Sequence, residues 1–299
     1  MKKLLVIISC GLIATSVCLG QKPEKAEPVV TQAPADSLTL ADPSDAKKTT
    51  PAAPETEVKS ALPALTVEQI MAKYRAGLGS TFTKQKITST TAIGTFSLTT
   101  MGLTGALEIN SKAPNKQVSS INLPGFGLIL EGFDGTDAWA QDPINGLRSK
   151  TGIEFAQTKN SSIFDREEQL EKLYPKMELK GTEKVKDRDA YVIQATSVDA
   201  GEETWYFDVE TFHLIRQDSV AESAQGKIPV QSYFEDFRAV NGVLIPFVSR
   251  LVSASGNVEV RLTEVKTNVM IDDAKFSKPK PAASKPAPAV TTPATKPGQ

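Results

Sequence analysis

The stretch EDFRAVNGVLIPF, residues 235–247, decides the fold. Two runs that contain β-branched and aromatic residues flank the dipeptide Asn241-Gly242. This dipeptide between two such runs predicts a tight hairpin turn, because Asn and Gly accept the positive φ angles that the turn requires. We therefore expect two antiparallel strands here, at residues 228–238 and 244–252.

Short runs of β-forming residues continue from this hairpin in both directions along the chain. Turn residues separate them, and Asp134-Gly135 between Phe133 and Trp139 predicts a second tight hairpin. The other expected strands are residues 86–96, 103–109, 117–123, 126–133, 177–179, 190–196, 203–208, 214–220 and 258–265. Together they favour a mainly β (α+β) fold built on one large, strongly curved antiparallel sheet.

Two segments follow a helical pattern instead. Thr66 is a candidate cap for a helix whose apolar residues recur at helical spacing over 67–74, with Gly77 at its end. Residues 153–174 show no alternation and mix apolar with charged side chains, so we expect one or two amphipathic helices that end before Pro175.

The composition divides the 299-residue chain into one domain and two flanks. All 12 Phe, 2 Trp and 5 Tyr lie between Tyr74 and Phe276, whereas 7 of the 19 prolines fall in residues 21–64 and 6 in 279–299. A segment without aromatic residues buries too little apolar surface to offset its loss of conformational entropy. We therefore expect a disordered Pro/Ala-rich linker at 21–64, a folded domain at 65–278 and a disordered Lys/Pro/Ala-rich tail at 279–299.

The first twenty residues are typical of a secretory signal peptide. The positive start Met1-Lys2-Lys3 precedes an apolar stretch that is too short and too interrupted to span a membrane. Both cysteines of the chain, Cys10 and Cys18, lie in this segment. We expect cleavage before Gln21 and free export, because the bulky Val17 disfavours the alternative, a lipid anchor on Cys18.

Few residues that carry chemistry remain after this segment. The mature chain has no cysteine and a single histidine, His213, which excludes a Ser-His-Asp triad in any ordinary form and an ordinary zinc site. A formal net charge of −1 offers no basic surface for nucleic acid and favours an apolar ligand. We expect no enzyme, no metal and no cofactor; an enzyme would need distant carboxylates such as Asp208 and Glu235 to converge.

Six short motifs, taken in order, resemble the outer-membrane lipoprotein-sorting carriers of the LolA type and their LppX-like relatives. They are AGLG (76–79), KAPNK (112–116), GFDGTDAW (132–139), WYFDVET (205–211), EDFRAVNGVLIPF (235–247) and NVMIDDAKF (268–276). The resemblance implies an incomplete antiparallel β-barrel with helices that form a lid over its concave face. It also implies a periplasmic protein of the Gram-negative envelope that holds acyl chains of lipoproteins or lipids in an apolar cavity, without catalysis.

Seven aromatic residues are the candidates for lining this cavity or its lid: Phe133, Trp139, Phe155, Phe164, Trp205, Phe207 and Phe247. The expected partners are lipoprotein or lipid acyl chains and, in addition, envelope proteins; we expect a monomer. The alternative is a structural or interaction module of the envelope that uses the same scaffold without a lipid ligand. A filled interior would favour this alternative, and a cavity would favour the carrier.

Overall fold

The computed structural model describes residues 65–79, 87–224 and 226–280. The predicted signal peptide at 1–20, with Cys10 and Cys18, lies outside the described residues. So do the linker at 21–64 and the tail from residue 281 onward. These three segments and the domain boundaries therefore stay predictions.

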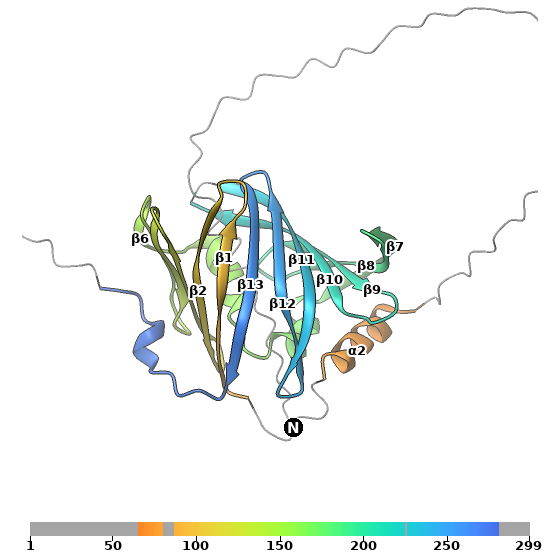
Figure 1. Cartoon of the computed structure of the whole chain (residues 1–299). Helices are drawn as coiled ribbons and strands as arrows, with labels where there is room; N and C mark the ends of the chain where they lie inside the picture. Colours follow the sequence, from red (N-terminus) through yellow and green to blue (C-terminus); the bar gives the residue numbers. More distant parts are fainter. Residues whose placement is uncertain (1–64, 80–86, 225, 281–299) are drawn as a thin grey trace, which may run out of the picture.

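In the described residues, thirteen antiparallel strands form a single curved sheet that does not close on itself (Figure 1). The strands are β1 (Ser89–Leu98), β2 (Leu103–Lys112), β3 (Lys116–Leu123), β4 (Gly127–Phe133), β5 (Ala138–Asp142), β6 (Gly146–Ser149), β7 (Lys176–Val185), β8 (Arg188–Thr196), β9 (Glu202–Asp208), β10 (Leu214–Ser223), β11 (Gly226–Val240), β12 (Val243–Ser253) and β13 (Gly256–Thr267). The expected fold, an incomplete antiparallel barrel with few helices, is confirmed.

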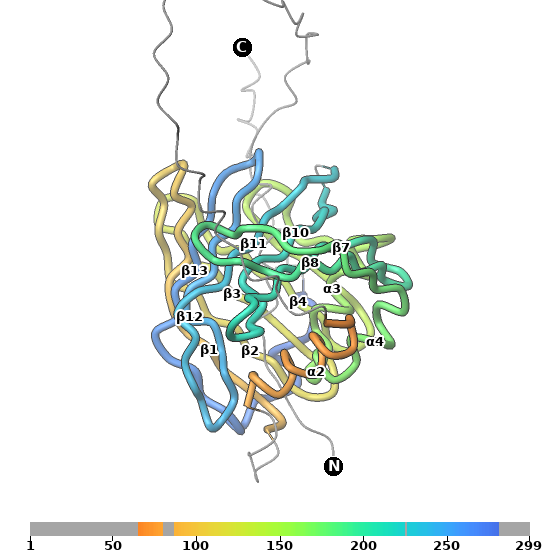
Figure 2. Tube along the Cα trace, turned by 90° about the vertical axis from the view of Figure 1, so that its right-hand side faces the viewer, coloured from red at the N-terminus to blue at the C-terminus, as the bar shows by residue number. Residues whose placement is uncertain are grey.

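The sheet consists of two meanders joined edge to edge. The strand order is β6-β5-β4-β3-β2-β1-β13-β12-β11-β10-β9-β8-β7, so β1 pairs with β13 and the two sheet edges are β6 and β7. The chain passes from one edge to the other through α3 (Gly152–Ser161), η1 (Arg166–Gln169) and α4 (Leu170–Leu173). We call residues 150–174 the crossover. Figure 2 shows α2, α3 and α4 gathered on one side of the curved sheet.

Each of the eleven predicted strands overlaps an observed one, and the two that the sequence pattern missed, β5 and β6, are only 5 and 4 residues long. Asn241-Gly242 forms the predicted two-residue turn, with φ angles of 49° and 79°. The second hairpin is present but wider than predicted. The Asp134 carboxylate accepts hydrogen bonds from the backbone N–H of Thr136 and Asp137, both at 2.8 Å, and this holds a four-residue connection.

The predicted first helix is also confirmed, as α2 (Val67–Gly77). Thr66 and Gln69 form a capping box, because the Thr66 hydroxyl accepts from the Gln69 backbone N–H at 3.3 Å and the Gln69 side chain accepts from the Thr66 N–H at 2.9 Å. The helix buries Ile70, Met71 and Tyr74 against the concave side of the sheet.

Apolar side chains occupy both faces of the sheet but unequally. The main cluster draws buried residues from β1–β4 and β8–β13 together with α2 and the crossover, and it lies on the concave side. A small cluster on the outer face joins Val118 and Trp139 to Ile271 and Phe276, the last from the C-terminal segment with η2 (Asp273–Phe276). The sheet therefore has one dominant apolar face, and this face carries the candidate site.

Candidate functional site

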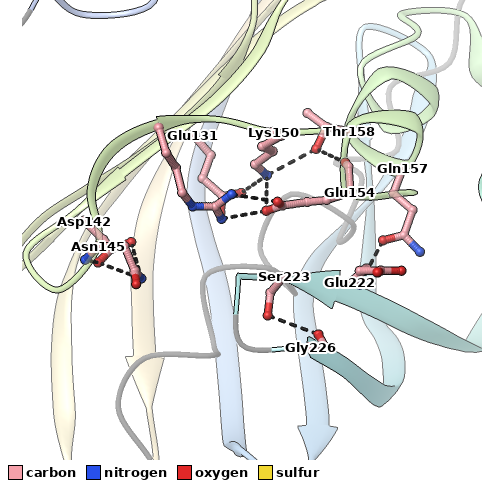
Figure 3. Close-up of polar contacts among 11 residues, drawn as sticks. Glu131, Asp142, Asn145, Lys150, Glu154, Gln157, Thr158, Glu222, Ser223 and Gly226 are labelled. Carbon is pink, nitrogen blue, oxygen red and sulfur yellow. Dashed lines mark hydrogen bonds and ion pairs between the residues drawn. The ribbon is translucent and has the colours of Figure 1, made fainter. Parts of the chain in front are cut away.

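Helix α3 is attached to the β4–β6 arm by a group of buried and half-buried polar side chains, four of them charged, which we call the Lys150 cluster: Glu131, Arg148, Lys150, Glu154 and Thr158. The Lys150 ammonium lies 3.2 Å from the Thr158 hydroxyl, 3.3 Å from a Glu131 carboxylate oxygen and 3.8 Å from Glu154 (Figure 3). The Arg148 guanidinium donates two hydrogen bonds of 2.7 Å to Glu154. This bidentate bond raises the pKa of Arg148.

Strand alternation places these groups on the concave face. Glu131 lies two residues from Ile129 and two from Phe133 on β4, and Ile129 belongs to the concave core. The backbone N–H of Lys150 donates to the Ala138 carbonyl at 2.8 Å, which continues the sheet ladder beyond β6. The cluster holds two cations and two carboxylates and so balances its charge, as a buried ionic group must.

The other side of α3 is tied to the β8–β10 arm. The Gln157 amide donates to the backbone carbonyl of Val220 at 2.7 Å and accepts from the backbone N–H of Glu222 at 3.1 Å. Asn160 donates to the Ser197 hydroxyl at 3.2 Å and to the Asp199 carboxylate at 3.1 Å. Helix α3 therefore bridges the two arms of the open sheet.

The inward side of α3 is polar, which differs from the amphipathic helix expected at 153–174. Its buried residues are Glu154, Ala156, Thr158, Asn160 and Ser161. The apolar residues follow later in the crossover, where Phe164, Leu170 and Tyr174 join the concave core. The difference has a physical reason: α3 packs on charged and amide groups at both of its attachments, so polar side chains satisfy it better than apolar ones.

Aromatic rings line the concave face beneath the second half of the crossover. The ring centroids of Tyr74 and Phe207 lie 4.9 Å apart, those of Tyr174 and Trp205 4.8 Å, and those of Trp205 and Phe207 6.3 Å. Glu203 serves two of these residues, because its carboxylate accepts from the Tyr174 hydroxyl and the Trp205 indole N–H, both at 2.7 Å. The polar tips of the rings are thus satisfied while their apolar bodies line the interior.

Two charged residues of the crossover, Arg166 and Glu167, lie in the same region as these aromatic rings. Arg166 donates to the Tyr174 hydroxyl at 2.8 Å and lies 3.6 Å from the Glu203 carboxylate. Burial raises the pKa of Tyr174 well above its ordinary value. Burial also raises the pKa of the Glu167 carboxyl to about 7, although the positive charge of Arg166 opposes the shift.

The structure separates the seven candidate aromatics into three groups. Phe164, Trp205, Phe207 and Phe247 belong to the concave core. Phe133 is buried on β4 and meets Phe155 of α3 with ring centroids 6.0 Å apart, beside the Lys150 cluster. Trp139 lies on the outer face, where its indole N–H donates to the Phe276 carbonyl at 3.0 Å.

The sequence pattern missed the polar residues of this face. Lys150, Glu131 and Glu203 look like ordinary surface charges, because nothing local distinguishes a charged residue that tertiary contacts bury. For Glu131 and Glu203, the alternation with apolar neighbours on β4 and β9 is the one signal of burial that the sequence offers, and Lys150 has no such signal. Within the described ranges, no group of three or more metal-ligating side chains could hold a metal ion.

No helix in the described part of the chain is both long and apolar enough to cross a bilayer. No protein-family model matches the chain, and no curated protein matches it either.

Solved structures that are similar to this chain include a LolA superfamily protein from Nitrosomonas europaea, at 19% identity over 72% of this chain and 99% of that one, with a TM-score of 0.46. A putative outer membrane lipoprotein-sorting domain from Vibrio parahaemolyticus is 11% identical over 70% and 95%, with a TM-score of 0.47. Lipoprotein LppX from Mycobacterium tuberculosis is 14% identical over 69% and 99%, with a TM-score of 0.28. These names are those of the carriers that the sequence motifs resemble.

Proposed function

We propose that this protein is a periplasmic carrier or binding protein that holds acyl chains of lipoproteins or lipids against the concave face of its sheet, without catalysis. One observation carries the proposal: the concave face of an unclosed sheet is apolar, and the chain crosses it through a helix held by polar contacts. The six sequence motifs that resemble the lipoprotein-sorting carriers support the same function.

The apolar face supplies the affinity. Each methylene that moves from water to an apolar surface contributes about 0.8 kcal/mol, so an acyl chain of a dozen carbons needs no charged group to bind tightly. Phe164, Trp205, Phe207 and Phe247 all contribute to this face, and Phe133 with Phe155 extends it toward the Lys150 cluster.

Because α3 is attached by polar contacts, its displacement can give an acyl ligand a route to and from the concave face. The polar side chains of α3, such as Gln157 and Asn160, form hydrogen bonds with the β8–β10 arm when α3 is in place and can form them with water when it is displaced. If α3 moves away from the sheet, the helix therefore exposes little apolar surface to water. If the later part of the crossover moves, Phe164 and Leu170 leave the core and expose it. For this reason we infer that α3, rather than the later part of the crossover, moves aside when the acyl ligand enters or leaves.

The test is acyl binding by the mature, delipidated protein. Native mass spectrometry should detect a co-purified acyl ligand, and a fluorescent fatty acid should rebind after delipidation. Phe164→Asp should weaken rebinding at least tenfold, because it places a carboxylate on the apolar face. Val252→Asp, a matched change at an exposed position of β12, should bind as the wild type does.

Circular dichroism of both variants would separate lost binding from lost folding. The carrier function would be contradicted if the native mass spectrum showed no ligand and if the folded wild type also failed to rebind the fatty acid. The envelope interaction module would then be the better interpretation of the scaffold.

A further inference from the structure

The concave face changes from apolar to polar along the strands of the β1–β4 arm. Strand pairing places Leu107, Ile121 and Ile129 side by side in one cross-strand row. The next row contains Ile109, Ser119 and Glu131, again side by side. The last row contains Thr90, Ser111 and Gln117, with Phe133 beside Gln117.

The residues of this last row are buried although they are polar. Thr90, Ser111 and Gln117 are 3%, 5% and 4% exposed. The crossover returns to this end of the sheet, since the Phe164 backbone N–H donates to the carbonyl of Pro114 in the β2–β3 turn at 3.0 Å. A buried polar row at one end of an apolar face is the arrangement that an amphipathic ligand requires.

Gln117 has an unused hydrogen-bonding group in this row. Its side-chain nitrogen donates to the Ser111 hydroxyl at 3.1 Å, and its side-chain oxygen has no hydrogen-bond partner among the residues that the structure describes. A buried acceptor without a partner carries a free-energy penalty, because it has lost its hydrogen bond to water and gained none in the protein. A ligand that donates a hydrogen bond here would recover that free energy.

We propose that Gln117, with Thr90 and Ser111 beside it, forms a subsite for an uncharged, hydrogen-bond-donating head of the acyl ligand, an amide N–H or a hydroxyl. This inference rests on the proposed function and names the ligand class. The three side chains of the subsite are uncharged, and the ammonium group of Lys150 is already paired with Glu131 of the next row at 3.3 Å, so the subsite itself offers no cation to an anionic head.

Competition against a fluorescent fatty acid tests this assignment. The competitors share one sixteen-carbon chain and differ in the head: a primary amide, a monoacylglycerol, a methyl ester and a carboxylate. The wild type should bind the amide or the monoacylglycerol about fivefold or more tighter than the methyl ester, the effect of about one hydrogen bond. Comparing the primary amide with the monoacylglycerol shows whether the subsite prefers an N–H donor or a hydroxyl donor.

Two variants make the test specific to Gln117. Gln117→Leu keeps the size of the side chain and should abolish the preference, so that the amide, the monoacylglycerol and the methyl ester bind with similar affinity. Ser111→Ala frees the Gln117 amide nitrogen as a donor and should tighten methyl ester binding instead. Gln141→Leu, on the outer face of β5, is the matched control and should behave as the wild type.

Three outcomes overturn the assignment. The wild type could bind the ester and the carboxylate as tightly as the two donors, or Gln117→Leu could keep the preference. A folded wild type that binds no acyl competitor at all would instead refute the proposed function, and the subsite with it.

Discussion

At the scale of single residues, Glu167 links the stability of this fold to pH. Its carboxyl group is 2% exposed, and burial raises its pKa to about 7 from 4.5. The native state therefore holds this proton more tightly than the unfolded state, so its contribution is full below about pH 4.5 and is lost as the pH rises through 7. Between pH 5 and pH 8 we expect a loss of about 2 to 3 kcal/mol from this group.

Urea unfolding of the wild type and of Glu167→Gln at both pH values measures this contribution. The variant keeps the size of the side chain and cannot ionise, so the wild type should lose about 2 to 3 kcal/mol more than the variant between pH 5 and pH 8. Glu210→Gln, at an exposed position in the turn after β9, should keep the wild-type dependence. Equal pH dependence of wild type and Glu167→Gln would contradict the argument.

The identity of an aromatic residue predicted whether it is buried better than it predicted which face of the sheet it lies on. Phe164 and Trp205 were expected at the concave face because large aromatic side chains among β-formers are usually buried. The position of Trp139 depends on its pairing with Gly132, and a shift of one residue would have turned it inward. Local sequence carries no signal for such a pairing, and none for the burial of Lys150.

At the scale of elements, the Lys150 cluster determines whether α3 stays on the sheet. Lys150→Met would remove one of the two positive charges that balance the buried carboxylates of Glu131 and Glu154. Leaving a buried carboxylate without its cation lowers the free energy of unfolding by about 3 to 5 kcal/mol. We expect a loss of this size in urea unfolding. Hydrogen exchange should also speed up in α3 before it does in the strands, because α3 loses its attachment to the β4–β6 arm.

Lys172→Met provides the control for this change. Lys172 is exposed on α4, so its replacement should change stability by less than about 0.5 kcal/mol. If Lys150→Met lost under 1 kcal/mol and α3 exchanged as in the wild type, the cluster would not hold the helix.

Elements were predictable wherever local pattern and turn chemistry agreed. The turn at Asn241-Gly242 and the cap at Thr66 are encoded by the residues that form them. The short strands β5 and β6 are not, because 5 and 4 residues are too few for an alternation to stand out. The polar inner side of α3 reflects its tertiary partners, which its own sequence does not reveal.

At the scale of the whole molecule, the pairing of β1 with β13 turns two meanders into one sheet with two faces. Residues far apart in the chain make this pairing, for example Thr90 with Thr267. Curvature then places the apolar core on the concave face, and the C-terminal segment covers part of the outer face with Phe276. The division into two faces is the property on which the proposed carrier function depends.

The two tryptophans report separately on these faces. Trp205 lies in the concave core, whereas Trp139 lies on the outer face beneath Phe276. A fatty acid brominated along its chain should quench the emission of Trp139→Phe, which keeps Trp205, because bromine quenches only at close contact. The same ligand should leave the emission of Trp205→Phe, which keeps Trp139, nearly unchanged. Equal quenching in both variants would show that the acyl chain is not confined to the concave face, and quenching of Trp139 alone would assign the binding surface to the outer one.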